Sequence, residues 1–271
     1  MTETRNGKAE NRNGQGPITD AQVAAVLRPF VRAARPLLGA LSDSDPLHLQ
    51  ARAVRAAEPG ADRNGKLPGR LLDRLARSRV PGTAAWAAMD VHERSRFWVR
   101  RVGRLTSLVA AVPGFAGIVT RKLPVSGALG AAAQGLVLTA LADEHDVHDE
   151  AEVVALLGAV MFRRDLSPQP RAALGETSNA QVDARAAELT GGLEKEKKPT
   201  LQRLGGAVWR MGMAFVALES ELNKRPHGGR ISGWLSLMPV VGVGGKYVGE
   251  WSGLKRAAKE GEKWLHAHHG A

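Results

Sequence analysis

The chain has 271 residues, a net charge of +11 at pH 7 and no cysteine. The lack of cysteine excludes disulfide bonds, thiolate metal sites and cysteine catalysis. Alanine, leucine, arginine and glycine are abundant, whereas tyrosine occurs once, and this balance favours helices over sheets. We therefore predict an all-α protein, a multi-helix bundle with glycine- and alanine-rich central helices and a disordered N-terminal tail.

Charge is distributed unevenly along the chain. Residues 1–122 carry 21 lysines and arginines against 10 acidic residues, a net charge of +11. Residues 123–199 carry 7 against 12, a net charge of −5, and residues 200–271 carry 10 against 5, a net charge of +5. Basic regions around an acidic, apolar middle are suited to anionic lipid, to nucleic acid or to each other, or form an ordinary solvated surface.

The N-terminal tail, residues 1–16, is polar and rich in glycine and asparagine. It offers almost nothing to bury, which predicts disorder. It lacks the apolar core of a secretory signal, so we expect a cytoplasmic protein.

Residues 17–104 form a basic N-terminal region of several predicted helices separated by turns. The first helix begins at a cap formed by Thr19 and Asp20. Pro29 and Pro36 interrupt its pattern, which predicts a kinked or split helix. Two further helices follow, each ending at a proline–glycine pair.

The helix that follows Asp90 has the best-defined apolar face of this region. Trp98 lies on that face, and five arginines lie beside or opposite it: Arg94, Arg96, Arg100, Arg101 and Arg104. Tryptophan and arginine next to an uncharged run are typical of a membrane interface. The membrane-interface candidates are therefore Trp98, Arg94, Arg100, Arg101 and Arg104. The alternative is an ordinary amphipathic helix with its arginines in water.

Residues 105–165 form the predicted apolar helical core. Within it, residues 123–142 contain no charge and match the length needed to cross a hydrocarbon core of about 30 Å. Alanine and glycine outnumber large aliphatic residues there, which argues against simple spanning. Three alternatives follow: a helix buried in protein, a hairpin or surface insertion embedded in the membrane, and a true span.

Residues 123–130 recur in altered form at residues 238–245. Each copy places a proline in the first turn of a predicted helix. Small residues then recur every four positions, which lets another backbone approach closely. The helix-packing residues are Pro124, Gly127, Ala131 and Gly135 in the first copy, and Pro239, Gly245, Gly249 and Gly253 in the second. We expect both stripes to be helix contacts, and one option is that they contact each other.

Residues 143–150 are the segment with the composition of a metal site. His145 and His148 are three positions apart and have acidic neighbours. However, Asp149 and Glu152 resemble a capping box for a helix that begins near residue 151. A capped, solvated turn is the favoured interpretation, and no metal or cofactor is predicted. The last three histidines are likewise expected in a frayed terminus and not in a ligand set. They are His266, His268 and His269.

Residues 166–200 form a predicted polar connection with one short polar helix around residues 181–189. Residues 201–271 then provide the C-terminal helices that complete the core. Thr200 is the predicted cap of the first of these. The apolar stripe of the last one includes Trp251 and Leu265.

No local motif of an enzyme is complete in this sequence. Residues 241–247 fail the phosphate-loop pattern, because Val240 replaces a required glycine and Tyr247 replaces a serine or threonine. They also fail the dinucleotide-binding fingerprint. Neither a Gly-x-Ser-x-Gly elbow nor a His-Glu-x-x-His motif occurs. No zinc finger or RNA-recognition motif supports nucleic-acid binding, which rests on charge alone.

The two Pro-Val-x-Gly-x-x-Gly segments, the run at residues 136–147 and the segment 249–258 resemble the EcsC-like family. This is a family of bacterial helical proteins named for a component encoded beside an ABC exporter. The resemblance covers about residues 105–165 and 231–260. It implies membrane association, a link to transport or envelope upkeep and a membrane-protein partner. It supplies no catalytic residues.

Our leading hypothesis is a non-enzymatic, membrane-associated protein on the cytoplasmic face of the cell membrane, in contact with anionic lipid. One alternative is a soluble helical ligand-binding protein or enzyme with a cavity between the two motif helices. The other is a basic nucleic-acid-binding protein.

Overall fold

The computed structural model describes residues 19–43, 81, 84–111, 125–166, 178–196, 199–223 and 245–270. They form helices α1 (Asp20–Asp43), α4 (Ala84–Ala87), α5 (Val91–Ala111), α7 (Val125–Glu144), α8 (Glu150–Phe162), α10 (Asn179–Thr190), α11 (Leu201–Asn223) and α13 (Gly245–His269), with a short 3-10 turn η1 (Leu193–Lys195). These residues contain no strand, so the all-α prediction is confirmed.

Several sequence predictions lie outside the described residues. These are the tail at residues 1–16, the two helices between α1 and residue 80, and both motif prolines, Pro124 and Pro239. Gly245 and Gly249 belong to α13, but what surrounds them is not described.

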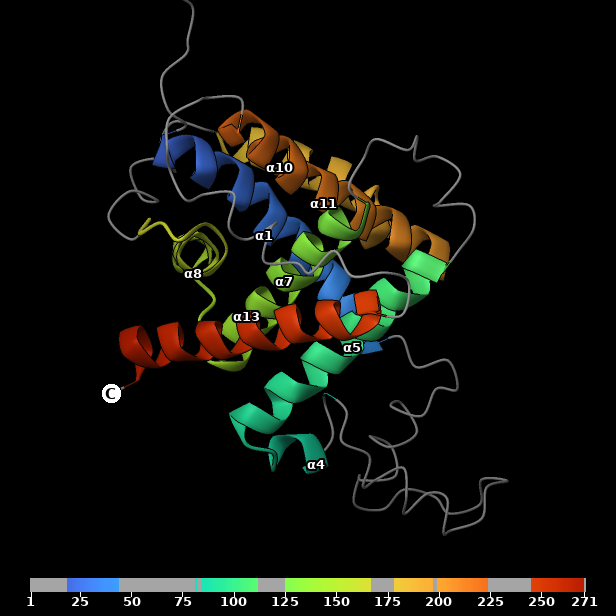
Figure 1. Ribbon diagram of the computed structural model, residues 1–271, viewed down its shortest axis with the longest axis vertical. Coiled ribbons are helices and arrows are strands. Elements are labelled where there is room, and N and C mark those ends of the chain that lie inside the picture. Colours follow the sequence, from blue (N-terminus) through green and yellow to red (C-terminus); the bar gives the residue numbers. More distant parts are fainter. Residues whose placement is uncertain are drawn as a thin grey trace, which may run out of the picture.

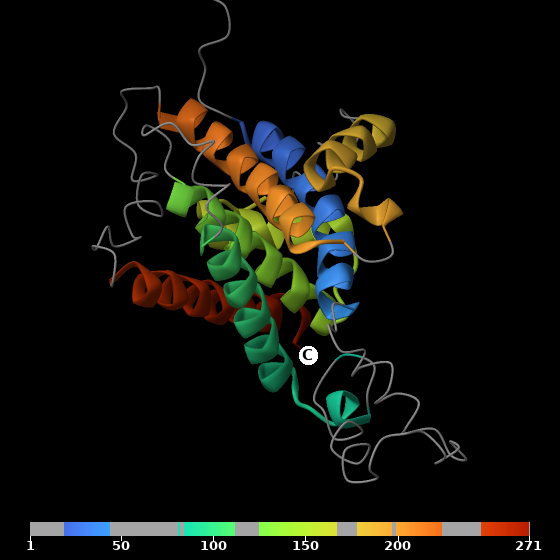
Figure 2. The same ribbon diagram turned by 90° about the vertical axis from the view of Figure 1, so that its right-hand side faces the viewer.

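The central element is α7, which is packed against α1, α5, α8, α11 and α13 (Figures 1 and 2). Leu136, Leu138 and Leu141 on α7 have no exposed surface, and Val137 is equally buried. From Gly127 to Ala142, the described part of the uncharged segment is therefore covered by protein, as in the first of the three alternatives. Within the described ranges, no helix combines the length and hydropathy needed to cross a membrane.

Helix α1 begins at a reciprocal capping box. The backbone N–H of Gln22 donates to Thr19 Oγ1 over 3.2 Å, and the N–H of Thr19 donates to Gln22 Oε1 over 3.0 Å. The helix continues unbroken through Pro29 and Pro36, so the predicted split does not occur. Burial of the face that contains Phe30 offsets the two lost backbone hydrogen bonds.

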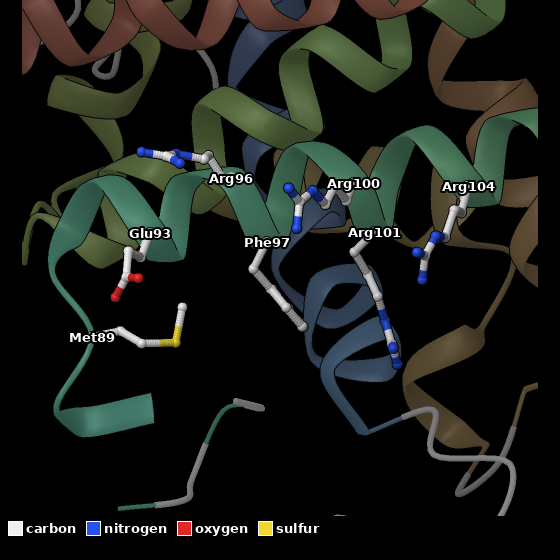
Figure 3. Close-up of a pocket in the computed structure, with 7 residues that line it drawn as sticks. All are labelled: Met89, Glu93, Arg96, Phe97, Arg100, Arg101 and Arg104. Atoms are coloured by element: carbon white, nitrogen blue, oxygen red, sulfur yellow. The ribbon is translucent and has the colours of Figure 1, made fainter. Parts of the chain in front are cut away.

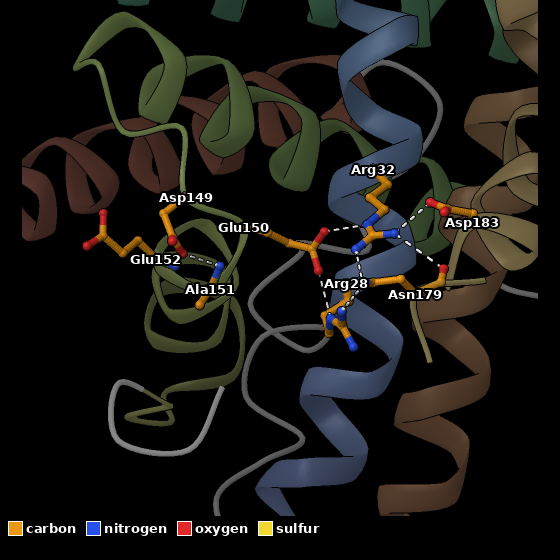
Figure 4. Close-up of polar contacts among 8 residues, drawn as sticks. All are labelled: Arg28, Arg32, Asp149, Glu150, Ala151, Glu152, Asn179 and Asp183. Carbon is orange, nitrogen blue, oxygen red and sulfur yellow. Dashed lines mark hydrogen bonds and ion pairs between the residues drawn. The ribbon is translucent and has the colours of Figure 1, made fainter. Parts of the chain in front are cut away.

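A charged network joins α1 to the start of α8 and to α10 (Figure 4). Arg28 Nε donates to Glu150 Oε1 over 2.7 Å, and Arg32 Nε donates to the other carboxylate oxygen. Arg28 Nη2 also donates to Asn179 Oδ1 over 3.1 Å, and Arg32 Nη1 to Asp183 Oδ1 over 2.6 Å. The hydrogen bond to Glu150 is the main cause that raises the pKa of Arg32. This network fixes α8 and α10 beside α1.

Helix α8 begins where the capping box predicts. Asp149 Oδ1 accepts hydrogen bonds from the N–H of Ala151 over 2.7 Å and from that of Glu152 over 3.2 Å. These bonds satisfy two backbone donors of the first turn. The cap is therefore confirmed.

The small-residue stripe of α7 is buried at Gly127, Ala131 and Gly135. A Cβ at Gly135 would lie 2.5 Å from Cζ of Phe30 and 3.4 Å from Cε2 of Phe215. This part of the stripe therefore contacts α1 and α11. Helix α13 lies over a different part of α7, since a Cβ at Gly253 would lie 3.7 Å from Gln134 Nε2.

The C-terminal helix α13 buries Leu254, Ala258 and Leu265, as the apolar stripe predicts. The expectation of a frayed terminus is wrong, because α13 continues to His269. Its last turns are held in place by packing, and the ring of His266 contacts the turn that follows α7.

Helix α5 runs without a break across residue 104, where composition places the border between the basic region and the apolar core. The polar connection contains the expected short helix, α10, and Thr200 Oγ1 caps α11 by accepting from the N–H of Arg203 over 3.3 Å.

Candidate functional site

The candidate site is the outward face of α5. This helix starts at Asp90, whose Oδ1 accepts a hydrogen bond from the N–H of Glu93 over 2.6 Å. Its buried face, which includes Val102 and Leu105, packs against α7. The helical period then places the opposite face in solvent.

Trp98 and Arg94 are turned inward. Trp98 is only 6 % exposed, and its Nε1 donates to Glu144 Oε1 over 2.9 Å. Arg94 Nη1 lies 3.3 Å from Glu144 Oε2, and Arg94 Nη2 donates to the carbonyl oxygen of Ala87 over 3.2 Å. Both membrane-interface candidates are thus internal contacts of α5 with its neighbours, which corrects the sequence-based assignment.

Arg101 also has a structural contact. Its Nε and Nη2 donate to the carbonyl oxygen of Leu41 over 3.0 and 2.6 Å, which links α5 to the last turns of α1. Its guanidinium carbon lies 5.8 Å from the centroid of the Phe97 ring. Arg101 therefore contributes charge to the surface while remaining anchored.

Three arginines of α5 are exposed and repeat every four residues: Arg96, Arg100 and Arg104. Within the described ranges, none of the three side chains makes a hydrogen bond or an ion pair. Leu108 continues the same row one turn later and is 53 % exposed. The outer face of α5 is thus a row of cations that ends in an apolar side chain. We call these four residues the arginine row.

A hollow of about 370 Å³ lies along the arginine row (Figure 3). Phe97 forms part of its wall and packs edge-on against Trp86 and Trp98, at centroid distances of 4.9 and 5.5 Å. The described residues that line the hollow are Met89, Glu93, Arg96, Phe97, Arg100, Arg101 and Arg104, and Glu93 is the single carboxylate among them. Four cations against one anion make the hollow attractive to negatively charged groups.

Sequence reasoning left Arg96 and Leu108 out of the candidate set. Their spacing of four residues from Arg100 and Arg104 was the signal that could have identified them. Met89 lies two residues before the first residue of α5 and also lines the hollow.

The metal-site hypothesis gains no support from the structure. His148 Nδ1 lies 3.5 Å from Asp143 Oδ1, in an exposed turn. In the part of the chain that the structure describes, no group of three or more histidine and acidic side chains could hold a metal ion.

Side chains fill the contact between α7 and the C-terminal half of α13. A Cβ at Gly261 would lie 2.5 Å from Leu138 Cδ2 and 3.7 Å from Leu141 Cδ2. One alternative reading of the sequence places a ligand cavity between the two motif helices. From Gly253 to the C-terminal end of α13, the contact between α7 and α13 gives no support for such a cavity.

No family model matches this sequence, and it has no match among curated proteins or solved structures.

Proposed function

We propose that this protein is a non-enzymatic, peripheral membrane protein that binds anionic lipid through the arginine row of α5. One observation carries the proposal: three arginines, Arg96, Arg100 and Arg104, are exposed on one side of α5, and their side chains make no contact within the described residues that would neutralise them.

The geometry of the row suits a flat, negatively charged surface. Each step of four residues advances about 6 Å along the helix, so the row extends about 12 Å from Arg96 to Arg104. Guanidinium groups match phosphate oxygens in shape and charge. Each lysine or arginine near an anionic bilayer contributes about 1 kcal/mol to binding, and three give an attraction that salt weakens.

Apolar side chains beside the row favour lipid over nucleic acid. Leu108 is exposed at the end of the row, and the half-buried Phe97 lies in the adjacent hollow. Leucine and phenylalanine next to arginine can enter the boundary between headgroups and acyl chains. A nucleic-acid backbone offers no such apolar layer. Nucleic acid is therefore the second candidate, and the experiment below separates the two.

The resemblance of the motif segments to the EcsC-like family supports the same proposal, since that family implies membrane association and a membrane-protein partner. We accordingly propose the cytoplasmic face of the cell membrane as the place where the protein acts.

The test is sedimentation of the full chain with vesicles of phosphatidylcholine alone and of phosphatidylcholine mixed with phosphatidylglycerol. We expect binding to the mixed vesicles only, with loss at raised salt. Substituting Arg96→Gln, Arg100→Gln and Arg104→Gln together should weaken binding by about 3 kcal/mol, roughly a hundredfold in Kd.

A matched control removes three exposed arginines elsewhere, as Arg185→Gln, Arg203→Gln and Arg256→Gln. It has the same net charge and should keep most of the binding. Equal loss in both variants would show that total charge matters and that the row does not. Tighter binding to duplex DNA at the same salt, lost in the row variant, would favour the nucleic-acid candidate instead.

A further inference from the structure

The C-terminal half of α13 packs against α7 and α8 (Figure 1). Histidines and glutamates of these helices and of α5 form a cluster there. At its centre, the rings of His145 and His266 meet edge to face with centroids 5.3 Å apart. We call the whole group the histidine junction, and its members are His92, His145, His266, His269, Glu144, Glu152 and Glu262.

His145 occupies a position that suits a neutral ring. Its Nε2 is buried and has no hydrogen-bond partner. Burial of the ring is the main cause that lowers the pKa of His145, and the neighbouring His266 lowers it further. A proton on His145 would therefore place a charge in a poorly solvated site beside a second imidazole.

The titratable groups around this pair come from four helices, and two of the contacts join a glutamate to a histidine that is charged only when it is protonated. From α5, His92 lies 3.3 Å from Glu262 of α13. From α8, Glu152 lies 3.6 Å from His269 of α13.

The remaining carboxylate of the junction, Glu144 at the end of α7, is shared by Arg94 and Trp98 of α5. Glu262 and Glu144 raise the pKa of His145, but each does so less than burial and His266 lower it. The carboxylates of the junction therefore offset only part of the cost of a proton on His145.

The junction holds a helix that covers apolar surface. Gly261 brings the α13 backbone so close that a Cβ there would lie 2.5 Å from Leu138 and 4.0 Å from Leu156. Leu265, one turn later, has no exposed surface. Release of the end of α13 would expose these leucines of α7, α8 and α13.

We propose that the histidine junction is a proton-sensitive latch, which holds the C-terminal half of α13 on α7 and α8 near neutral pH and releases it on acidification. The direction follows from proton uptake. In the released state His145 regains its ordinary pKa of about 6.5, whereas the docked state disfavours the proton. The released state binds more protons, so it gains population as the pH falls below about 6.5.

The test is amide hydrogen exchange of the full chain at about pH 7.5 and about pH 5.5, on either side of the ordinary histidine pKa. Protection factors, which remove the intrinsic effect of pH on exchange, should fall several-fold in residues 255–269 at the lower pH. Those of α1 should stay constant. An equal fall in α1 would indicate global acid unfolding and would overturn the latch, as would constant protection in α13.

The diagnostic variant is His145→Phe, which keeps an aromatic ring against His266 and removes the titrating nitrogen. It should abolish most of the pH-dependent loss of amide protection in α13. The control is His148→Asn, which removes an exposed histidine of the same turn and should leave the loss intact.

If His145→Phe does not fold, His145→Gln serves the same purpose, because it also removes the titrating ring, and it should reduce the pH-dependent loss of protection in α13. A full pH-dependent loss in either folded variant would overturn the proposal.

Discussion

Trp98 Nε1 in α5 donates a hydrogen bond of 2.9 Å to Glu144 Oε1 at the end of α7. The other oxygen of the same carboxylate lies 3.3 Å from Arg94. One glutamate therefore turns both residues toward the core and fixes the rotation of α5. With that rotation, Arg100 and the rest of the arginine row face outward.

Replacing this carboxylate tests its structural role. Glu144→Ala should lower the free energy of unfolding by about 1–3 kcal/mol, because it leaves the buried Trp98 N–H and the guanidinium of Arg94 without their acceptor. Urea denaturation measures the change. The matched control is Glu188→Ala, whose ion pair with Arg185 is exposed and should contribute less than about 0.5 kcal/mol. Equal effects would contradict the assigned role.

Two glycines of α11 should respond in opposite ways to alanine. A Cβ at Gly212 would overlap the carbonyl group of Ala128, with the carbonyl carbon 2.6 Å away, and backbone cannot move aside cheaply. We expect Gly212→Ala to destabilise by about 1–3 kcal/mol or more. A Cβ at Gly206 would meet only Arg210 Nη1, at a distance of 3.4 Å, so Gly206→Ala should stabilise by up to about 1 kcal/mol through helix propensity. Thermal denaturation of both variants would check the contrast, and a stable Gly212→Ala protein would mean that α7 and α11 are further apart.

The network between α1 and α8 should depend on Glu150. The side chain of Arg28 is 3 % exposed, so Glu150→Ala removes the carboxylate from a nearly buried cation. We expect the free energy of unfolding to fall by about 2–3 kcal/mol, a value reduced because Glu150 is partly exposed. Asp183→Ala removes an exposed partner of Arg32 and should cost less than about 1 kcal/mol. Urea denaturation should rank the two in this order, and the reverse order would refute the assignment.

Arg163 ends α8 in the left-handed region, with φ of 55°. Arg163→Gly should stabilise the protein by about 1 kcal/mol, because glycine adopts this conformation without a Cβ clash. The exposed ion pair with Glu260 that is lost contributes little. Arg163→Ala is the control: it removes the same ion pair but keeps the Cβ, so it should not stabilise. If both variants are more stable than the original protein, the gain comes from removal of the Arg163 charge and not from the backbone conformation.

The helices and their caps could be predicted from the sequence because they depend on neighbouring residues. Thr19 and Asp149 accept hydrogen bonds from backbone groups only two or three positions away, so the residue types alone identify both caps. The apolar stripes of α11 and α13 and the uncharged α7 likewise follow from periodicity and composition. These features support the all-α prediction.

Periodicity does not identify the partner of each side chain. It placed Arg94 and Arg101 at the border of the α5 face. Only the tertiary structure shows that Arg94 pairs with Glu144 and that Arg101 is anchored to the Leu41 carbonyl. Periodicity could not show that α1 remains continuous through its prolines, because burial against other helices supplies the compensating free energy.

The sequence by itself therefore determined where many of the helices form, how several of them begin and which of their faces are apolar, since these properties arise within a few turns of chain. The outward direction of the arginine row and the meeting of His145 with His266 arise from contacts between residues distant in sequence. Such contacts depend on how the faces of several helices fit together in space, so only the tertiary structure could establish them.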